Sequence, residues 1–186
     1  VLDEKFLQNT NEYFLGDVLA SNTTSANFFQ SGGHGSTSAI QLRGLPKRYS
    51  TVYIDGVKMS DPSSVSGDYD FNHILTSQIS RVEILKGNQS SVYGSGAIGG
   101  TINITTKKGQ PGKKKNVMFN TGSHNTNNYS ISFSGADEED NYYVGFERFQ
   151  TEGMSAMTHN DEKDGYKNNS LVANYSRELP NNFKIK

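Results

Sequence analysis

Apolar and polar side chains alternate strictly in four successive segments of the second half of the chain. These segments are residues 116–121, 129–134, 142–147 and 170–175. In one of them, Tyr129, Ile131 and Phe133 alternate with serines. Successive residues of an extended strand point to opposite faces of a sheet. Each segment therefore predicts a β-strand with one apolar face and one mostly polar face.

The connections between these strands differ in length. Residues 135–141 and 178–182 form short, acidic or proline-containing turns, whereas residues 151–169 form a long polar connection. Short turns at one end and long loops at the other are typical of outer-membrane β-barrels. A two-sheet sandwich also explains the alternation, but its connections are normally short at both ends. The connection at 122–128 is short for an outer loop, so the pattern favours a membrane barrel and leaves the sandwich open.

Composition narrows the class of protein further. The chain has 186 residues, of which 33% are apolar and 20% charged, with a formal net charge of -1 and no cysteine. No apolar stretch approaches the length of a transmembrane helix. The absence of cysteine excludes thiolate metal sites, cysteine nucleophiles and disulfides, and the near-zero charge implies no general attraction to nucleic acid. The chain starts at Val1 without a signal peptide, so we expect a mature or a truncated sequence.

The first half of the chain contains a mixture of helix and strand patterns. We predict a helix over residues 11–20, capped by Asn9 or Asn11, and an Asp-Gly turn at Asp55 and Gly56 between two short strands. Further strands are predicted at 39–43, 79–85 and 101–106. Residues 107–115 (KKGQPGKKK) are typical of a linker. We therefore predict two domains, a small mixed α+β domain at 1–109 and the alternating strands at 110–186.

One glycine motif has the form of a dinucleotide-binding loop. Residues 94–99 (GSGAIG) match G-x-G-x-x-G, but that mechanism needs a helix directly after the glycines. Residues 101–106 (TINITT) are strand-forming instead. We therefore expect the glycines to allow tight turns and close packing between two strands. No H-E-x-x-H or G-x-S-x-G motif is present and the four histidines are scattered, so we expect no enzyme activity.

Several motifs in a fixed order indicate a family. They are residues 40–44 (IQLRG), 52–57 (VYIDGV), 79–87 (ISRVEILKG) and 91–104 (SVYGSGAIGGTINI). In this order and spacing they resemble the plug domain of TonB-dependent receptors over roughly residues 10–108. The later strands are similar to the start of that family's barrel of about 22 strands. The resemblance implies an α+β plug domain with a small mixed sheet, followed by the first antiparallel strands of a transmembrane β-barrel that is incomplete in this chain.

The sequence departs from the family pattern at three places. Residues 22–26 (NTTSA) stand where the family usually has Pro-Gly-Val, and residues 86–88 (KGN) stand where it usually has Arg-Gly-Pro. The TonB box, the segment that contacts the energy-coupling protein, is not recognisable before Asp3. These departures concern local loop geometry and the coupling segment rather than the fold.

The resemblance also implies a location, partners and a mechanism. The expected location is the outer membrane of a Gram-negative cell, and the expected partners are the TonB energy-coupling protein, a small-molecule ligand and outer-membrane lipid, with no nucleic acid. Ligand is captured outside by plug apexes and barrel loops, and TonB then moves the plug by using the inner-membrane proton gradient. Four charged residues resemble charges that the family keeps at the plug–barrel boundary. They are Arg43, Arg81, Glu83 and Lys86.

The ligand is inferred from two loops. Residues 30–44 resemble the first apical loop of vitamin B12 receptors, and residues 65–67 fall where those receptors have a second apical contact. Small residues there leave room for a bulky ligand. A cobalamin is favoured, with a ferric siderophore or haem as the alternative within the family and a soluble β-rich binding or adhesive module as the alternative outside it. The expected contact residues are Ser36, Thr37, Ser38, Val65, Ser66 and Gly67.

The long polar connection also carries clustered acidic residues. Glu162 and Asp164 fall where vitamin B12 receptors place calcium ligands. Calcium takes about six to eight oxygen ligands, so this segment supplies only part of a coordination shell. A solvated acidic loop is the alternative. No cofactor is expected to be required, and Ca²⁺ in this outer loop is the one possible ion.

Overall fold

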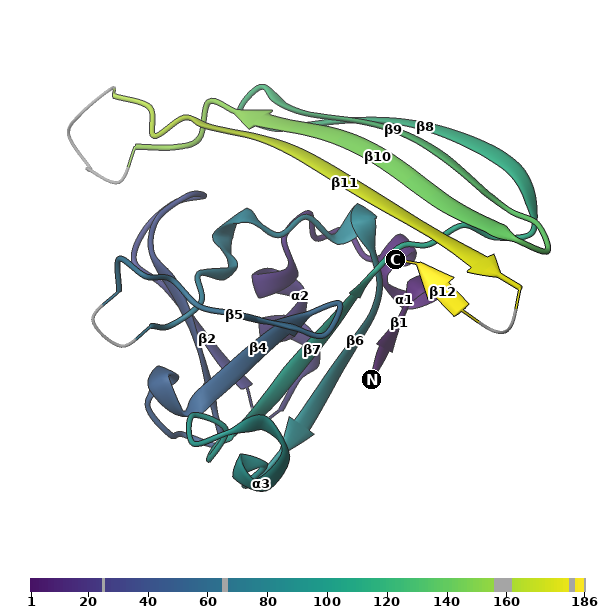
Figure 1. Ribbon diagram of the computed structural model, residues 1–186. Coiled ribbons are helices and arrows are strands. Elements are labelled where there is room, and N and C mark those ends of the chain that lie inside the picture. The colour runs from purple at the N-terminus through teal and green to yellow at the C-terminus, as the bar shows by residue number, and fades with distance from the viewer. Residues whose placement is uncertain (25, 65–66, 156–161, 181–182, 186) are drawn as a thin grey trace. The chain divides into compact units, whose positions relative to one another are not determined.

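The computed structural model describes residues 1–24, 26–64, 67–155, 162–180 and 183–185. The chain divides into two compact units, Val1–Thr106 and Lys107–Lys186, and each is described by itself (Figure 1).

The first unit contains a five-stranded mixed sheet. Its strands lie in the order β1 (Leu2–Asp3), β6 (Ile79–Lys86), β7 (Gly100–Thr106), β4 (Ser50–Ile54) and β5 (Val57–Met59). The pair β4 and β7 is parallel, with Ser50 opposite Gly100, and the other pairs are antiparallel. A separate hairpin joins β2 (Ala26–Gln30) to β3 (Ser38–Leu42). This arrangement confirms the predicted small mixed sheet.

Helices complete the first unit. The α-helices are α1 (Glu4–Asn9), α2 (Leu15–Asn22) and α3 (Ser90–Tyr93), and three short 3-10 helices are η1 (Lys47–Tyr49), η2 (Phe71–His73) and η3 (Thr76–Gln78). Leu15, Val18 and Leu19 on α2 are fully buried, and burying such a side chain stabilises the fold by about 1.5–3 kcal/mol. Their core partners are Leu7, Ala26, Ile40, Leu42, Val52, Phe71, Ile79, Val82, Ile102 and Ile104. No helix among the described residues is both long and apolar enough to cross a membrane.

The start of the predicted helix was wrong. The helix begins at Leu15 rather than at residue 11, and its N-cap is Phe14, which makes no side-chain capping hydrogen bond. Phe14 instead forms a β-bridge with Leu75, and the Leu15 backbone N–H donates to the Ile74 carbonyl at 2.9 Å. The Ile74 carbonyl, which is distant in the sequence, thus accepts a hydrogen bond from a helix N–H group that would otherwise need a local capping side chain. Asn9 ends the preceding helix α1.

The Asp-Gly turn and the glycine motif agree with their predictions. Asp55 and Gly56 have φ values of 49° and 85°, as a two-residue type I′ hairpin turn requires. The Asp55 carboxylate also accepts a hydrogen bond from the Thr106 backbone N–H at 3.0 Å. After the motif the chain enters strand β7 and not a helix, and the Gly99 N–H donates to the Tyr49 carbonyl at 2.9 Å. The motif therefore leads into a closely packed strand, and no helix follows it to face a pyrophosphate.

The second unit is a single antiparallel sheet. Its strands are β8 (Gly112–Gly122), β9 (Thr126–Ala136), β10 (Asp140–Thr151), β11 (Tyr166–Leu179) and β12 (Phe183–Ile185), and each pairs with the next along the chain. The connection between β10 and β11 spans 152–165, whereas 123–125 and 137–139 form three-residue turns. This meander of long strands has the predicted order and alternation.

A row of exposed apolar side chains lies on one face of this sheet, which we call the outer face. Val117, Ile131, Phe146 and Leu171 lie opposite one another across four strands and are 75%, 40%, 43% and 69% exposed. Residues on the opposite face, such as Glu147, are buried. A row of exposed apolar side chains is unusual on a surface in contact with water and is the pattern of a strand face in contact with lipid.

Candidate ligand-binding site

The first apical loop, residues 31–37, joins β2 to β3 and is held by its own hydrogen bonds. The Ser31 N–H donates to the Thr37 carbonyl at 3.1 Å, and the Ser36 hydroxyl donates to the Gly33 carbonyl at 2.8 Å. The Gln30 side-chain amide reaches the same Gly33 carbonyl at 2.6 Å. Ser36 is half-buried and Thr37 is exposed.

Ser38 has a different position from the one predicted. It is 3% exposed, its hydroxyl donates to Asp70 Oδ1 at 2.6 Å, and it accepts from the Phe71 backbone N–H at 3.0 Å. This hydroxyl is therefore engaged within the unit and is not offered to a ligand, which corrects the prediction of a direct contact. The physical reason is strand alternation, because Ser38 shares the inward face of β3 with Ile40 and Leu42.

The second apical loop, residues 60–67, follows β5. Val65 and Ser66, which were predicted to contact the ligand, lie outside the described residues. Gly67 is half-buried with a φ of +66°, and its N–H donates to the Ser64 carbonyl at 3.0 Å. Earlier in the loop, hydrogen bonds from the Ser63 hydroxyl and backbone lower the pKa of the Asp61 carboxyl. The loop thus contains a local turn at Asp61 and a backbone hydrogen bond between Gly67 and Ser64.

The second loop is anchored where it ends. The Asp68 carboxylate, whose side chain is 5% exposed, forms an ion pair with Lys47 Nζ at 2.7 Å. Two residues later, Asp70 accepts the Ser38 hydroxyl and also caps η2 by accepting from the Asn72 backbone N–H at 3.0 Å. The Ser38–Asp70 hydrogen bond therefore joins the end of the first apical loop to the end of the second. The ends of the two predicted ligand loops are therefore joined within the first unit.

Lys47, Asp68 and Asp70 were not identified from the sequence. The available signal was the alternation in β3, which places Ser38 inward and so requires a polar partner for its buried hydroxyl. That signal does not say which of the many downstream carboxylates is the partner, because the two residues are 32 positions apart.

Of the four charged residues predicted at the plug–barrel boundary, two form an ion pair with each other. Arg81 and Glu83 form an ion pair along β6, in which Arg81 Nε donates to Glu83 Oε1 at 2.9 Å. Arg43 has a φ of +56°, and its guanidinium lies beside Gly87, where an added Cβ would stand 3.3 Å from Nη1. Lys86 is exposed. Within the first unit, two of the four charges thus neutralise each other, and Arg43 lies beside the residue that follows Lys86.

The predicted calcium ligands lie on the long connection of the second unit. Glu162 and Asp164 are both exposed, and Lys163 between them forms an ion pair with Glu152. The hydrogen bond from Lys163, followed by one from Asn125, lowers the pKa of the Glu152 carboxyl. Among the residues that the structure describes, no group of three or more His, Cys, Asp or Glu side chains is placed to hold a metal. These two carboxylates supply at most part of the shell of about six to eight oxygens that calcium takes, and the other ligands have to come from elsewhere.

Comparison with known proteins identifies the family. Residues 1–101 match the family described as TonB-dependent Receptor Plug Domain. The chain therefore belongs to the TonB-dependent receptors, whose members are outer-membrane proteins of Gram-negative cells. Over 161 residues, it is 32% identical to the vitamin B12 transporter BtuB of Photobacterium profundum, covering 83% of this chain and 26% of that transporter. Membership in a receptor family agrees with the prediction of an outer-membrane receptor rather than a soluble module.

Solved structures show the same fold. A mutant of the ferric enterobactin receptor PfeA from Pseudomonas aeruginosa, in complex with enterobactin, matches with a TM-score of 0.71 and 20% identity, covering 96% of this chain and 30% of that one. The FrpB iron transporter from Neisseria meningitidis matches with a TM-score of 0.77 and 14% identity, covering 98% and 29%. The chain thus spans about a third or less of these relatives, and similarity at this identity supports the predicted fold alone.

Proposed function

We propose that this protein captures a scarce, bulky ligand at the cell surface and imports it with energy supplied through TonB, and that the ligand is a cobalamin. The observation that carries the proposal is the joining of the two apical loops by the Ser38–Asp70 hydrogen bond. Two loops of small residues held side by side offer a broad surface with backbone hydrogen-bonding groups, which suits a large rigid ligand. The 32% identity to a vitamin B12 transporter supports this choice of ligand.

A ferric siderophore is the second candidate. The ferric enterobactin receptor and the iron transporter share the fold at 20% and 14% identity. An iron chelate is also large and rigid, so the same loops suit it in size. The two candidates differ in charge and in any need for calcium, and the experiment uses that difference.

We include calcium in the proposal for the long connection. Glu162 and Asp164 supply oxygen ligands of the kind that calcium prefers, and Lys163 between them is already neutralised by Glu152. An ion there would order the connection through charge neutralisation.

The test is cyanocobalamin binding to outer membranes that carry the full-length receptor, with calcium and then with a chelator. We expect tight binding that weakens on chelation, and replacing both Glu162 and Asp164 with the matching amides should abolish the chelator effect. Absence of cyanocobalamin binding in both conditions would reject the cobalamin proposal. In that case ferric chelates are the ligands to test on the same membranes.

Replacing Thr37 with tryptophan tests the first apical loop. Thr37 is exposed, so the large ring is tolerated by the fold but occupies the space of the ligand. We expect cyanocobalamin affinity to fall at least about tenfold, which corresponds to about 1.4 kcal/mol, while the amount of receptor in the membrane stays unchanged. Unchanged affinity would remove this loop from the site. Val57→Trp, on the exposed strand β5, is the matched control.

A further inference from the structure

Two asparagines of the second unit hold the linker through which the chain enters that unit. The Asn141 side-chain amide accepts a hydrogen bond from the Gly109 backbone N–H at 2.8 Å and donates one to the Gly109 carbonyl at 3.0 Å. The Asn174 side-chain amide donates to the Lys107 carbonyl at 2.7 Å. Backbone groups of the linker thus have side-chain partners within the second unit. We call Asn141 and Asn174 the linker clamp.

Strand register brings the two asparagines of the linker clamp together. Asn174 on β11 lies opposite Tyr143 on β10, and Asn141 precedes Tyr143 by two residues. Because side chains alternate along a strand, both amides share the face that carries the buried Tyr143, opposite the outer face. They are diagonal neighbours on adjacent strands. A side-chain amide there can both accept from and donate to a backbone segment laid across it.

The linker approaches the sheet so closely that residue 109 has to be glycine. An added Cβ at Gly109 would overlap the Gly135 carbonyl oxygen and would stand 2.8 Å from the Tyr142 carbonyl oxygen. Gly135 and Tyr142 lie opposite each other in the β9–β10 ladder, so neither carbonyl can move aside without disturbing that pairing. Two residues after Gly109, Pro111 forms a β-bridge with Ala136. The linker is therefore packed against the sheet as well as hydrogen-bonded to it.

The chain is also held directly before the linker. The Asp55 carboxylate accepts hydrogen bonds from the Thr106 backbone N–H at 3.0 Å and from the Thr106 hydroxyl. Thr106 ends both β7 and the first unit. Between Thr106 and Gly109 stand only Lys107 and Lys108, and Lys108 is exposed. The backbone torsion angles of these two residues can therefore change while Thr106 stays bonded in the first unit and Gly109 in the second.

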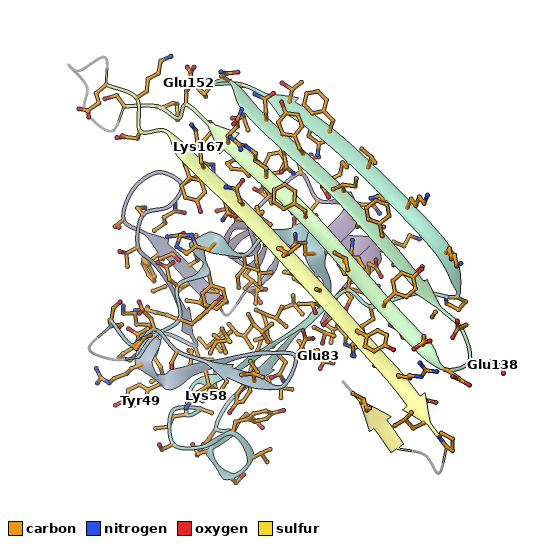
Figure 2. All side chains as sticks on the ribbon, turned by 45° about the horizontal axis from the view of Figure 1, so that its top comes forward. Tyr49, Lys58, Glu83, Glu138, Glu152 and Lys167 are labelled. Atoms are coloured by element: carbon orange, nitrogen blue, oxygen red, sulfur yellow. The ribbon has the colours of Figure 1, made fainter. Side chains whose placement is uncertain are left out.

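The linker clamp lies at the end of the sheet that carries the short turn 137–139. Figure 2 shows Glu138 of this turn at one end of the sheet and Glu152 and Lys167 at the opposite end. The bridge between Pro111 and Ala136 places the linker next to the Glu138 turn. Short turns of outer-membrane barrels face the periplasm. The linker clamp is therefore expected on the periplasmic side of the receptor.

We propose that Asn141 and Asn174 keep the linker on the sheet while TonB moves the first unit, so that the movement turns about Lys107 and Lys108. A few residues at the end of an element commonly absorb the torsion changes of such a movement. A linker that lifted off the sheet would take up part of the displacement that TonB imposes, whereas a fixed linker leaves that displacement to the first unit. The two asparagines are thus positioning residues, and their role rests on the TonB-coupled uptake proposed above.

Trypsin cleavage after Lys108 measures whether the linker is held. Cleavage of a folded protein follows the population of its locally opened state. In outer membranes that carry the full-length receptor without ligand, we expect Asn141→Ala, which removes two hydrogen bonds, to raise the cleavage rate at least about tenfold, and Asn174→Ala, which removes one, about fivefold. Gly109→Ala keeps both asparagines and is expected to match Asn141→Ala, because the added Cβ displaces the linker. Mass spectrometry of the fragments identifies the bond that is cut.

Two matched controls make the cleavage result specific. Asn116→Ala replaces an exposed asparagine on β8 of the same sheet. Gly122→Ala adds a Cβ that would stand 3.7 Å from Thr126 Cβ, an ordinary contact. Both controls are expected to be cleaved after Lys108 as slowly as the unchanged receptor. Unchanged cleavage in Asn141→Ala and Gly109→Ala, or an equal rise in the controls, would overturn the clamp.

Uptake by cells with intact TonB tests the role of the clamp in transport. The double variant Asn141→Ala with Asn174→Ala is expected to bind cyanocobalamin with unchanged affinity, since both residues lie outside the apical loops. At equal amounts of receptor in the membrane, we expect it to import the ligand about tenfold more slowly. Unchanged uptake together with faster cleavage would overturn the role in transport. Failure of the unchanged receptor to bind cyanocobalamin would reject the proposed ligand, whereas the cleavage measurement, made without ligand, still decides whether the clamp holds.

Discussion

Replacing Ser38 with alanine is expected to raise the dissociation constant for cyanocobalamin about tenfold without removing a ligand contact. The change deprives Asp70 of a donor and the Phe71 N–H of its acceptor. Leaving a buried polar group unpaired costs about 1–3 kcal/mol. This cost destabilises the arrangement in which the two apical loops are joined relative to arrangements in which they are apart. When the binding-competent arrangement becomes less populated, the apparent affinity falls by the same factor.

Equilibrium binding and a distance measurement check this expectation together. Spin labels at residues 33 and 63, one in each apical loop, should give a broader distance distribution in Ser38→Ala than in the unchanged receptor, and saturating ligand should narrow it again. Asp70→Asn keeps an acceptor for Ser38 and should behave nearly like the unchanged receptor. Ser21→Ala removes a hydroxyl bonded only within helix α2 and is the matched control. A tenfold affinity loss with an unchanged distance distribution would contradict the positioning role.

Replacing Gly100 with alanine is expected to prevent the first unit from folding. Gly100 has a φ of +147°, and an added Cβ would stand 2.4 Å from the Leu85 carbonyl oxygen and 2.8 Å from Leu42 Cδ1. The carbonyl belongs to the neighbouring strand β6, so it cannot move aside without breaking the sheet. Backbone strain and overpacking each cost about 1–3 kcal/mol, and together they are a large part of the stability of a small domain.

Limited trypsin digestion of the full-length receptor in membranes measures this effect. Arg81 and Lys86 lie in strand β6 and should resist cleavage in the unchanged receptor but be cut rapidly in Gly100→Ala. Gly33→Ala is the control, because nothing lies within 4 Å of an added Cβ there. Equal protease resistance in the two variants would show that the strand packing tolerates a side chain at Gly100.

Features with local causes were predictable from the sequence. The Asp55-Gly56 turn, the strand after the glycine motif and the alternating strands of the second unit all depend on residues next to one another. The family followed from motifs in a fixed order. For the turn and the strands the physical signal was contained in fewer than about fifteen neighbouring residues, which is the range over which periodicity and turn chemistry act.

Features with distant causes were not predictable. The start of α2 depends on the bridge between Phe14 and Leu75, and the buried hydroxyl of Ser38 has its partner in Asp70, 32 positions away. The residues next to Leu75 and Asp70 in the sequence do not identify these two residues as partners. The loops of the candidate site remain a prediction from the resemblance, and the hydrogen bond between Ser38 and Asp70 required the three-dimensional structure.

The order of strands in the first unit has a consequence for how the chain is made. Strand β7 lies at the centre of the sheet, between β6 and β4, yet it is the last strand of the unit to leave the ribosome. Until residue 106 has been synthesised, β4 and β6 have no common neighbour to pair with, and the parallel pairing of β4 with β7 joins segments 50 residues apart. Contacts between distant segments form slowly. The early part of the chain therefore cannot complete its sheet until β7 has been synthesised.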